Sequence, residues 1–194
     1  MDAPLVGRSA VLAEVNALAR AGRSVLLVGP AGSGKTAVIE RVRRDGMLVV
    51  DPFEHISTPH AASLRRALDR GAVILAGARS LDRADMGHVG RVAWRLEPVW
   101  LRPLPARAIL AILRARLPEA TGPALQPGRQ WFSDAVRAAD GLPGRAVSIA
   151  SMAVRRWREC GVIMAPRLAL IAAWQATCEQ RPGSPGRTSL RLEE

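Results

Sequence analysis

The sequence predicts an α/β fold, with a parallel sheet sandwiched by helices and a small all-helical lid after it. In the first half of the chain, short apolar runs alternate with segments whose apolar residues recur at helical spacing. A glycine-rich loop lies between the first apolar run and the helical segment that follows it. From Pro105 onward every apolar pattern is helical. We therefore expect an α/β core at residues 1–104, a helical lid at 105–178 and a disordered tail at 179–194.

The first elements follow from capping and turn residues. Ser9 is placed to cap a helix whose apolar residues recur at helical spacing, and Gly22 is placed to end it. The run at residues 24–28 is short and almost wholly apolar, as expected of a parallel strand covered on both faces. A helix from about Lys35 to Arg44 follows the glycine-rich loop.

Three further strands are expected in the core. An apolar strand at residues 47–50 runs into Asp51, and a helix at 61–70 leads into a third strand at 72–76. Residues 99–101 can form a fourth strand. Strands that alternate with helices indicate a parallel sheet with right-handed crossovers.

The lid is predicted from four helical stripes of apolar residues. They lie at residues 109–117, 131–139, 147–157 and 168–174. No strand pattern interrupts them, so a small bundle of helices is the expected arrangement.

The net charge of +11 suits a partner rich in phosphate, such as DNA, because neutralised phosphates release counterions. The composition offers a second explanation. Lys35 is the only lysine, and the chain is rich in arginine, alanine, glycine and proline, as a GC-rich genome would make it. Charge alone speaks to association and not to fold, so both explanations stay open.

The chain carries no pattern of secretion or membrane insertion. A basic segment followed by an apolar run is absent near Met1, and the late apolar stretch at 162–176 is interrupted by Pro166 and Arg167. Cys160 and Cys178 lie far apart with no CxxC spacing, so we expect buried or half-buried thiols in a reducing compartment. The expectation is a cytoplasmic protein with no membrane partner.

Residues 29–36 fit GxxxxGK[ST], the pattern of a phosphate-binding P-loop, and they lie between a predicted strand and a predicted helix. Glycines let the backbone turn its N–H groups inward, and the helix N-terminus adds partial positive charge. Lys35 is expected to bridge the β- and γ-phosphates of ATP, and the Thr36 hydroxyl to ligate Mg²⁺. The predicted nucleotide-binding residues are Gly29, Pro30, Ala31, Gly32, Ser33, Gly34, Lys35, Thr36 and Ala37.

Two acidic residues follow the second predicted strand. Asp51 stands where P-loop proteins place the acid that holds Mg²⁺ through water, and a plain strand-ending turn aspartate is the alternative. Glu54 could polarise the attacking water, or be an exposed loop acid without a role. In many such ATPases the glutamate directly follows the aspartate, and here Pro52 occupies that position.

Further segments, in this order and spacing, resemble AAA+ ATPases. They are Leu5-Val6-Gly7-Arg8 before the P-loop, Val-Val-Asp at 49–51, Ala-Val-Ile-Leu-Ala-Gly-Ala-Arg-Ser at 72–80, Arg-Leu-Glu-Pro-Val at 95–99 and Gly-Leu-Pro-Gly-Arg at 141–145. Within that superfamily the sequence looks closest to the origin-recognition, transposition-helper and signal-transducing branches. The resemblance covers about Leu5 to Trp157.

This resemblance implies roles for residues on either side of the P-loop. Val6, Gly7 and Arg8 would line the adenine pocket. The end of the strand at 72–76 would present the sensor-1 polar group, with Arg79 or Ser80 as candidates, although the usual Asn or Thr is absent.

The resemblance also implies two catalytic arginines. Arg95 matches the arginine finger, which reaches the γ-phosphate of a neighbouring subunit. Arg145 matches sensor 2, which reaches from the lid to the nucleotide of its own subunit. For each, a solvated surface cation is the alternative, because the chain has so many arginines.

The sequence departs from the family in one respect. AAA+ cores usually have five strands in the spatial order 5-1-4-3-2, and too few residues separate the P-loop helix from the Asp51 strand for strand 2 and its helix. Strand 2 is an edge strand, so its loss would leave four contiguous strands in a compact core. The rival reading makes residues 47–50 strand 2 and leaves no magnesium aspartate.

The resemblance implies an ATPase that uses ATP and Mg²⁺, assembles head to tail with copies of itself, and remodels or loads an unidentified protein client or DNA. The alternative is a nucleotide-dependent switch or adaptor that hydrolyses ATP slowly or not at all. A small P-loop kinase is a third possibility, for which the sequence offers no substrate-binding segment.

Overall fold

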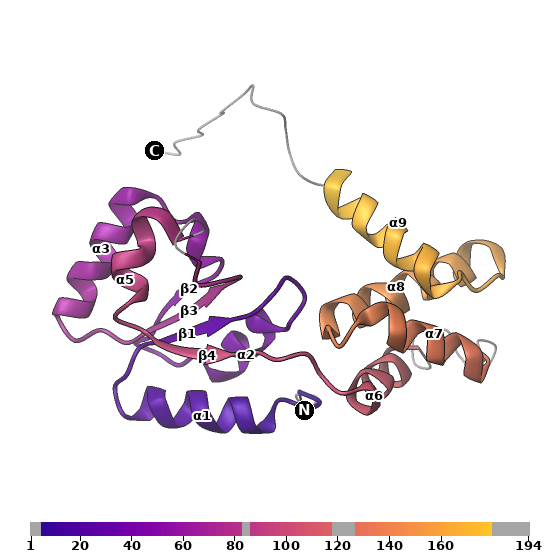
Figure 1. The fold of residues 1–194 in the computed structure, drawn as a ribbon, viewed down its shortest axis with the longest axis horizontal. Helices are drawn as coiled ribbons and strands as arrows, with labels where there is room; N and C mark the ends of the chain where they lie inside the picture. The colour runs from indigo at the N-terminus through magenta and orange to yellow at the C-terminus, as the bar shows by residue number, and fades with distance from the viewer. Residues whose placement is uncertain (1–4, 83–85, 118–126, 180–194) are drawn as a thin grey trace.

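The computed structural model describes residues 5–82, 86–117 and 127–179, and in it a four-stranded sheet lies beside a bundle of helices (Figure 1). In chain order the elements are α1 (Ser9–Arg20), β1 (Val25–Val28), α2 (Lys35–Val42), β2 (Leu48–Val50), the 3₁₀ turn η1 (Phe53–His55), α3 (Thr58–Asp69), β3 (Ile74–Ala78), the 3₁₀ turn η2 (Gly87–Val89), α5 (Gly90–Ala93), β4 (Glu97–Trp100), α6 (Ala106–Arg116), α7 (Arg129–Ala139), α8 (Pro143–Cys160) and α9 (Pro166–Glu179). The predicted α/β fold with an all-helical second part is confirmed.

The strands pair in the order β2-β3-β1-β4, and all three pairings are parallel. Val25 of β1 lies opposite Leu75 of β3 and Glu97 of β4. Because the strands are parallel, the segments that follow β1, β2 and β3 all emerge at the carboxyl ends of the strands, which we call the carboxyl edge of the sheet. This edge therefore receives the P-loop, Asp51 and Arg79 together.

Each face of the sheet has its own apolar core. Val25 and Leu27 of β1 face a cluster that includes residues of α1 and α2, and Leu26 and Val28 face a cluster made with η1, α3, η2 and α5. Figure 1 shows α1 below the sheet and α3 with α5 above it. All four side chains of β1 are at most 1% exposed, as a strand covered on both faces requires.

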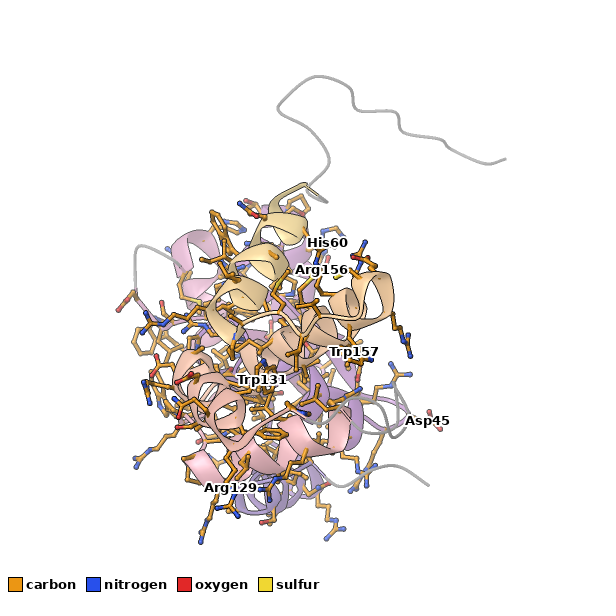
Figure 2. All side chains as sticks on the ribbon, turned by 90° about the vertical axis from the view of Figure 1, so that its right-hand side faces the viewer. Asp45, His60, Arg129, Trp131, Arg156 and Trp157 are labelled. Atoms are coloured by element: carbon orange, nitrogen blue, oxygen red, sulfur yellow. The ribbon has the colours of Figure 1, made fainter. Side chains whose placement is uncertain are left out.

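The helices α6, α7, α8 and α9, which belong to the segment predicted to be the lid, pack around an apolar core of their own. Trp131 of α7 lies inside it and donates its indole N–H to the carbonyl oxygen of Met164, 3.0 Å away, just before α9 begins. In the view along the long axis, Trp131 lies within the lid and Arg129 at its periphery (Figure 2). The indole group therefore has a partner for its polar atom while its ring fills the core.

Two strands differ from their predicted bounds. β3 starts and ends two residues later than predicted, because Gly77 and Ala78 continue the strand beyond residue 76. β4 starts two residues earlier and includes Pro98. An edge strand tolerates proline, whose missing N–H can face away from the sheet.

Helix starts were also partly wrong. Ser9 was predicted to cap α1, yet it is the first helical residue, and Arg8 precedes the helix without a side-chain cap. α3 begins at Thr58 with Pro59 in its first turn, three residues before the predicted start. The short elements η2 and α5 lie between the third and fourth predicted strands, where no element was predicted.

Glu179, predicted to begin the tail, ends α9, and the remaining tail lies outside the described residues. Cys160 is exposed, contrary to the prediction, because it is the last residue of α8 and points away from the lid core. The side chain of Cys178 lies outside the described part. Within the described residues, no helix is both long and apolar enough to cross a membrane.

Candidate functional site

The P-loop joins β1 to α2, and two of its glycines have left-handed backbone conformations. Gly32 has φ 80° and Gly34 has φ 95°, values that side-chain-bearing residues rarely adopt. Lys35 folds back over the loop and donates to the carbonyl oxygens of Gly29, 2.7 Å away, and Pro30, 3.2 Å away. Lys35 therefore spans the loop that is predicted to bind phosphate.

Burial lowers the pKa of Lys35 from its ordinary value, although nearby charges act on it as well. Asp51 and Glu54 oppose this shift by raising the pKa, and Arg79 adds to it. The carboxylates of Asp51 and Glu54 and the cations of Lys35 and Arg79 therefore lie close together at the carboxyl edge of the sheet.

Asp51 follows β2 and meets the P-loop at Thr36. The Thr36 hydroxyl donates to Asp51 Oδ2 over 2.6 Å. A Cβ on Gly77 would lie 2.6 Å from Asp51 Oδ1, so this glycine leaves the space that the carboxylate occupies. A hydroxyl and a carboxylate are the hard oxygen donors that Mg²⁺ prefers, so these residues fit the ion. In the order 5-1-4-3-2, the place of β2 beside the neighbour of β1 is that of strand 3. The strand order and the contact with Thr36 both favour the reading in which Asp51 is the magnesium aspartate.

Glu54 lies in η1, and its side chain is only 10% exposed. It is therefore not the exposed loop acid that the sequence left open. Among the described residues, neither carboxylate oxygen has a hydrogen-bond partner. Its Oε1 lies 3.5 Å from Arg79 Nε, an ion pair that joins the segment after β2 to the end of β3. A buried carboxylate beside cations and a phosphate-binding loop is a candidate functional group.

Of the two sensor-1 candidates, Arg79 reaches the site. It directly follows Ala78, the last residue of β3, and pairs with Glu54. The Ser80 hydroxyl accepts a hydrogen bond from the N–H of Asp82 over 3.1 Å, a contact within its own turn. The two-residue shift of β3 is what brings Arg79 to the sheet edge.

Arg8 lies under the P-loop, and its guanidinium is buried. It donates to the carbonyl oxygen of Ser33 over 2.7 Å and to that of Arg102 over 2.8 Å. Burial lowers the pKa of Arg8. The two bonds fasten the P-loop to the segment after β4, a structural role that charge alone does not suggest.

The other two predicted adenine-pocket residues lie between the core and the lid. Val6 packs against the lid core. Gly7 has φ 71°, and a Cβ there would lie 2.9 Å from a methyl group of Leu104. The segment before α1 therefore borders both the P-loop and the start of the lid.

The lid touches the P-loop through the start of α8. The N–H of Gly144 donates to the carbonyl oxygen of Gly32 over 2.8 Å, and a Cβ on Gly144 would lie 2.6 Å from Gly32 Cα. Arg145 is the next residue, so its backbone is beside the P-loop, while its Nη1 lies 3.7 Å from Asp140 Oδ2. α2 and α8 both begin at the loop, so the positive ends of two helix dipoles are close to it.

Arg95 lies away from all these residues. It precedes β4, at the edge of the sheet opposite to the P-loop, and its Nη1 donates to Asp69 Oδ1 over 2.6 Å. The structure therefore does not bring Arg95 to its own P-loop. An arginine that acts in a neighbouring subunit needs this separation.

The close contacts of Gly77 and Gly144, and the burial of Arg8, were not predicted from the sequence. Each makes a close contact with a residue distant in the chain, which no local pattern records. The pair of Glu54 and Arg79 was missed for the same reason.

A family model described as AAA ATPase domain matches residues 4–139 of the chain. No curated protein matches the sequence closely enough to count as a relative.

Solved structures resemble this one at low sequence identity. A mutant of RuvB from Thermotoga maritima is 12% identical with a TM-score of 0.56, over 88% of this chain and 70% of that one. Cdc6p from Pyrobaculum aerophilum is 13% identical with a TM-score of 0.55, over 82% and 64%. The AAA domain of FIGL-1 in complex with ADP is 15% identical with a TM-score of 0.55, over 90% and 82%. At these identities the likeness is one of fold.

Proposed function

The chain belongs to the AAA+ superfamily of P-loop ATPases, and from this premise we propose that it hydrolyses ATP with Mg²⁺ in a site that a second copy completes. The observation that carries the proposal is the position of Glu54, a nearly buried carboxylate without a hydrogen-bond partner among the described residues, at the sheet edge that holds Lys35 and Asp51.

Each residue of the edge has a distinct task in this proposal. Lys35 exchanges its bonds to the carbonyl oxygens of Gly29 and Pro30 for phosphate oxygens. Thr36 and Asp51 hold the ion, and bound Mg²⁺ supplies charge that neutralises the transferred phosphate. Glu54 orients the attacking water and accepts its proton. Arg79 holds Glu54 in place.

Two arginines complete the neutralisation of spreading negative charge. Arg145 turns from Asp140, a partner 82% exposed, toward a nucleotide beside Gly32. Arg95 leaves Asp69 and enters the site of the neighbouring copy. Trp94, beside Arg95, is 83% exposed, and exposed aromatic residues of this size are typical of protein interfaces.

A nucleotide-dependent switch is the second candidate function, and a different observation favours it. Pro52 occupies the usual glutamate position, and Glu54 is held by Arg79 rather than free to meet water. In this case the contact between Gly32 and Gly144 would report nucleotide binding to the lid with little turnover.

Turnover measurements separate the two functions. We expect the wild type to hydrolyse ATP with a rate per molecule that rises with protein concentration, and Lys35→Ala and Glu54→Gln to abolish it. Nucleotide binding without hydrolysis at every concentration, with and without DNA, would exclude the ATPase and leave the switch.

The client is proposed more broadly as DNA or a protein that the assembly remodels. RuvB of Thermotoga maritima, described as a Holliday junction branch migration motor, is 11% identical over 87% of this chain and 69% of that one, with a TM-score of 0.51. The net charge of +11 is the feature of this chain that supports a DNA client.

A further inference from the structure

The positive charge of the chain is concentrated in its lid. Residues 105–178 contain ten arginines and four acidic residues. Several of these arginines are paired: Arg137 with Asp134, Arg145 with Asp140, and Arg155 and Arg156 with Glu159. Arg107, Arg114 and Arg129 are not among these pairs.

These three arginines line one groove between α6 and α7, with a volume of about 520 Å³. Arg107 and Arg114 are both exposed and lie two helical turns apart on α6, and Arg129 is exposed at the start of α7. Figure 2 shows Arg129 at the periphery of the lid. Among the described residues, no acidic side chain lines the groove and none of the three arginines makes an ion pair.

The floor of the groove is apolar and holds one arginine in place. Half-buried Leu110, Phe132 and Val136 line it. The Arg114 guanidinium carbon lies 5.8 Å from the centre of the Phe132 ring, and Trp131 meets this ring edge-on at 5.4 Å. A cation held over an aromatic ring keeps its N–H groups available for a further partner.

We propose that this α6–α7 groove binds the phosphodiester backbone of a nucleic acid strand without reading its bases. Unpaired arginines recognise phosphate oxygens with bidentate hydrogen bonds, and a groove of this volume holds more than one phosphate. Arg114 already covers Phe132, so the ring positions the arginine rather than stacking on a base. The inference rests on the proposed function only for the role of the bound strand.

The arginines have an alternative explanation, in which the composition of the chain spreads them over the whole surface. This explanation makes a different prediction about nucleic-acid binding. It requires that any three exposed arginines contribute equally to nucleic-acid affinity. Arg20, Arg43 and Arg70 of the core are exposed and serve as the matched control set with the same loss of charge.

The test measures binding of fluorescein-labelled single-stranded and duplex DNA of mixed sequence to the full chain, by fluorescence anisotropy between 50 and 200 mM salt and without nucleotide. Omitting nucleotide keeps the result independent of ATP hydrolysis. The proteins are the wild type, the groove variant Arg107→Gln/Arg114→Gln/Arg129→Gln, the control variant Arg20→Gln/Arg43→Gln/Arg70→Gln, and the groove variant with lysine at all three positions.

We expect the groove variant to bind at least about tenfold more weakly, and the slope of log affinity against log salt to fall by about 2 to 3 because three phosphate contacts are lost. The control variant should change affinity less than about threefold. The lysine variant keeps the charge and should retain most of the salt slope. Tighter binding of single-stranded DNA or of duplex DNA identifies which of the two backbones the groove fits.

Equal losses in the groove and control variants would overturn the proposal, as would a wild type that binds neither DNA. Poly-glutamate that competes as well as DNA would make the groove a surface for acidic protein instead. If circular dichroism shows that the triple glutamine variant is unfolded, the single variants Arg107→Gln and Arg129→Gln test the proposal instead. Each should reduce the salt slope by about 0.7 to 0.9, and an unchanged slope in both would refute the groove.

Discussion

The Thr36 hydroxyl donates a 2.6 Å hydrogen bond to Asp51 Oδ2, and this bond joins the end of the P-loop to the carboxyl end of β2. The relationship predicts the behaviour of Asp51→Asn. The amide oxygen can still accept from Thr36, so the fold should survive while the charge that attracts Mg²⁺ is lost. We expect ATP affinity with Mg²⁺ to fall at least about tenfold, the effect of about 1.4 kcal/mol.

Calorimetric titration of ATP with Mg²⁺ and with EDTA checks this prediction. In EDTA the variant and the wild type should bind alike. Equal binding in Mg²⁺ as well would mean that Asp51 is only a turn residue and that β2 corresponds to strand 2 of the family.

Glu54→Gln separates binding from chemistry. The amide keeps the size of the side chain but cannot accept a proton from water, so turnover should fall by about 10²-fold or more. ATP affinity should stay within about threefold of the wild type, since the proposed role begins after binding. Glu40→Gln, an exposed carboxylate of α2, is the matched control and should leave both unchanged.

Arg95→Ala tests whether a second copy completes the site. Because Arg95 lies at the amino ends of the strands, opposite to the P-loop of its own chain, the variant should bind ATP normally and lose turnover. Mixing it with Lys35→Ala should restore part of the activity, since each protein then supplies what the other lacks. Asp69→Asn releases Arg95 without removing it and should not lower turnover. An unmixed Arg95→Ala protein with full turnover would remove this arginine from the mechanism.

Gly144→Ala tests the contact between lid and P-loop. The new methyl group would lie 2.6 Å from Gly32 Cα, so the lid must move or the loop must deform. We expect a loss of about 1–3 kcal/mol in unfolding free energy, and weaker ATP binding. Among the described residues, a Cβ on Gly128 would meet no atom within 4 Å, so Gly128→Ala should stay within about 0.5 kcal/mol of the wild type in chemical denaturation. Equal stability of the two variants would argue against the docked lid.

The sequence predicted those parts of the fold whose signals are local. The P-loop follows from glycines at fixed spacing, and β1 from an unbroken apolar run. The predicted strand at 72–76 stopped before Gly77, which β3 in fact includes. The role of Gly77 is to leave space for a carboxylate 26 positions earlier in the chain, and only the pairing of β2 with β3 reveals that.

The candidate site was predicted in its residue types and less well in its contacts. Asp51 and Lys35 could be singled out because the motif and the family resemblance fix their positions relative to strand ends, and their roles stay predictions. The burial of Arg8 and the pairing of Glu54 with Arg79 depend on long-range packing, and charged side chains are normally exposed. Such contacts leave no periodic signal in the sequence.

The loss of the outermost family strand has a consequence at β2, which borders the sheet with Leu48 39% exposed and Val49 44% exposed. In the five-stranded order a further strand would cover this border and satisfy its main-chain groups. Here the uncovered border can pair with any extended peptide that approaches, the usual starting point of aggregation. β2 is only three residues long, which limits such pairing to a few hydrogen bonds. In this small fold, the shortness of β2 limits edge pairing, as a covering strand does in the five-stranded order.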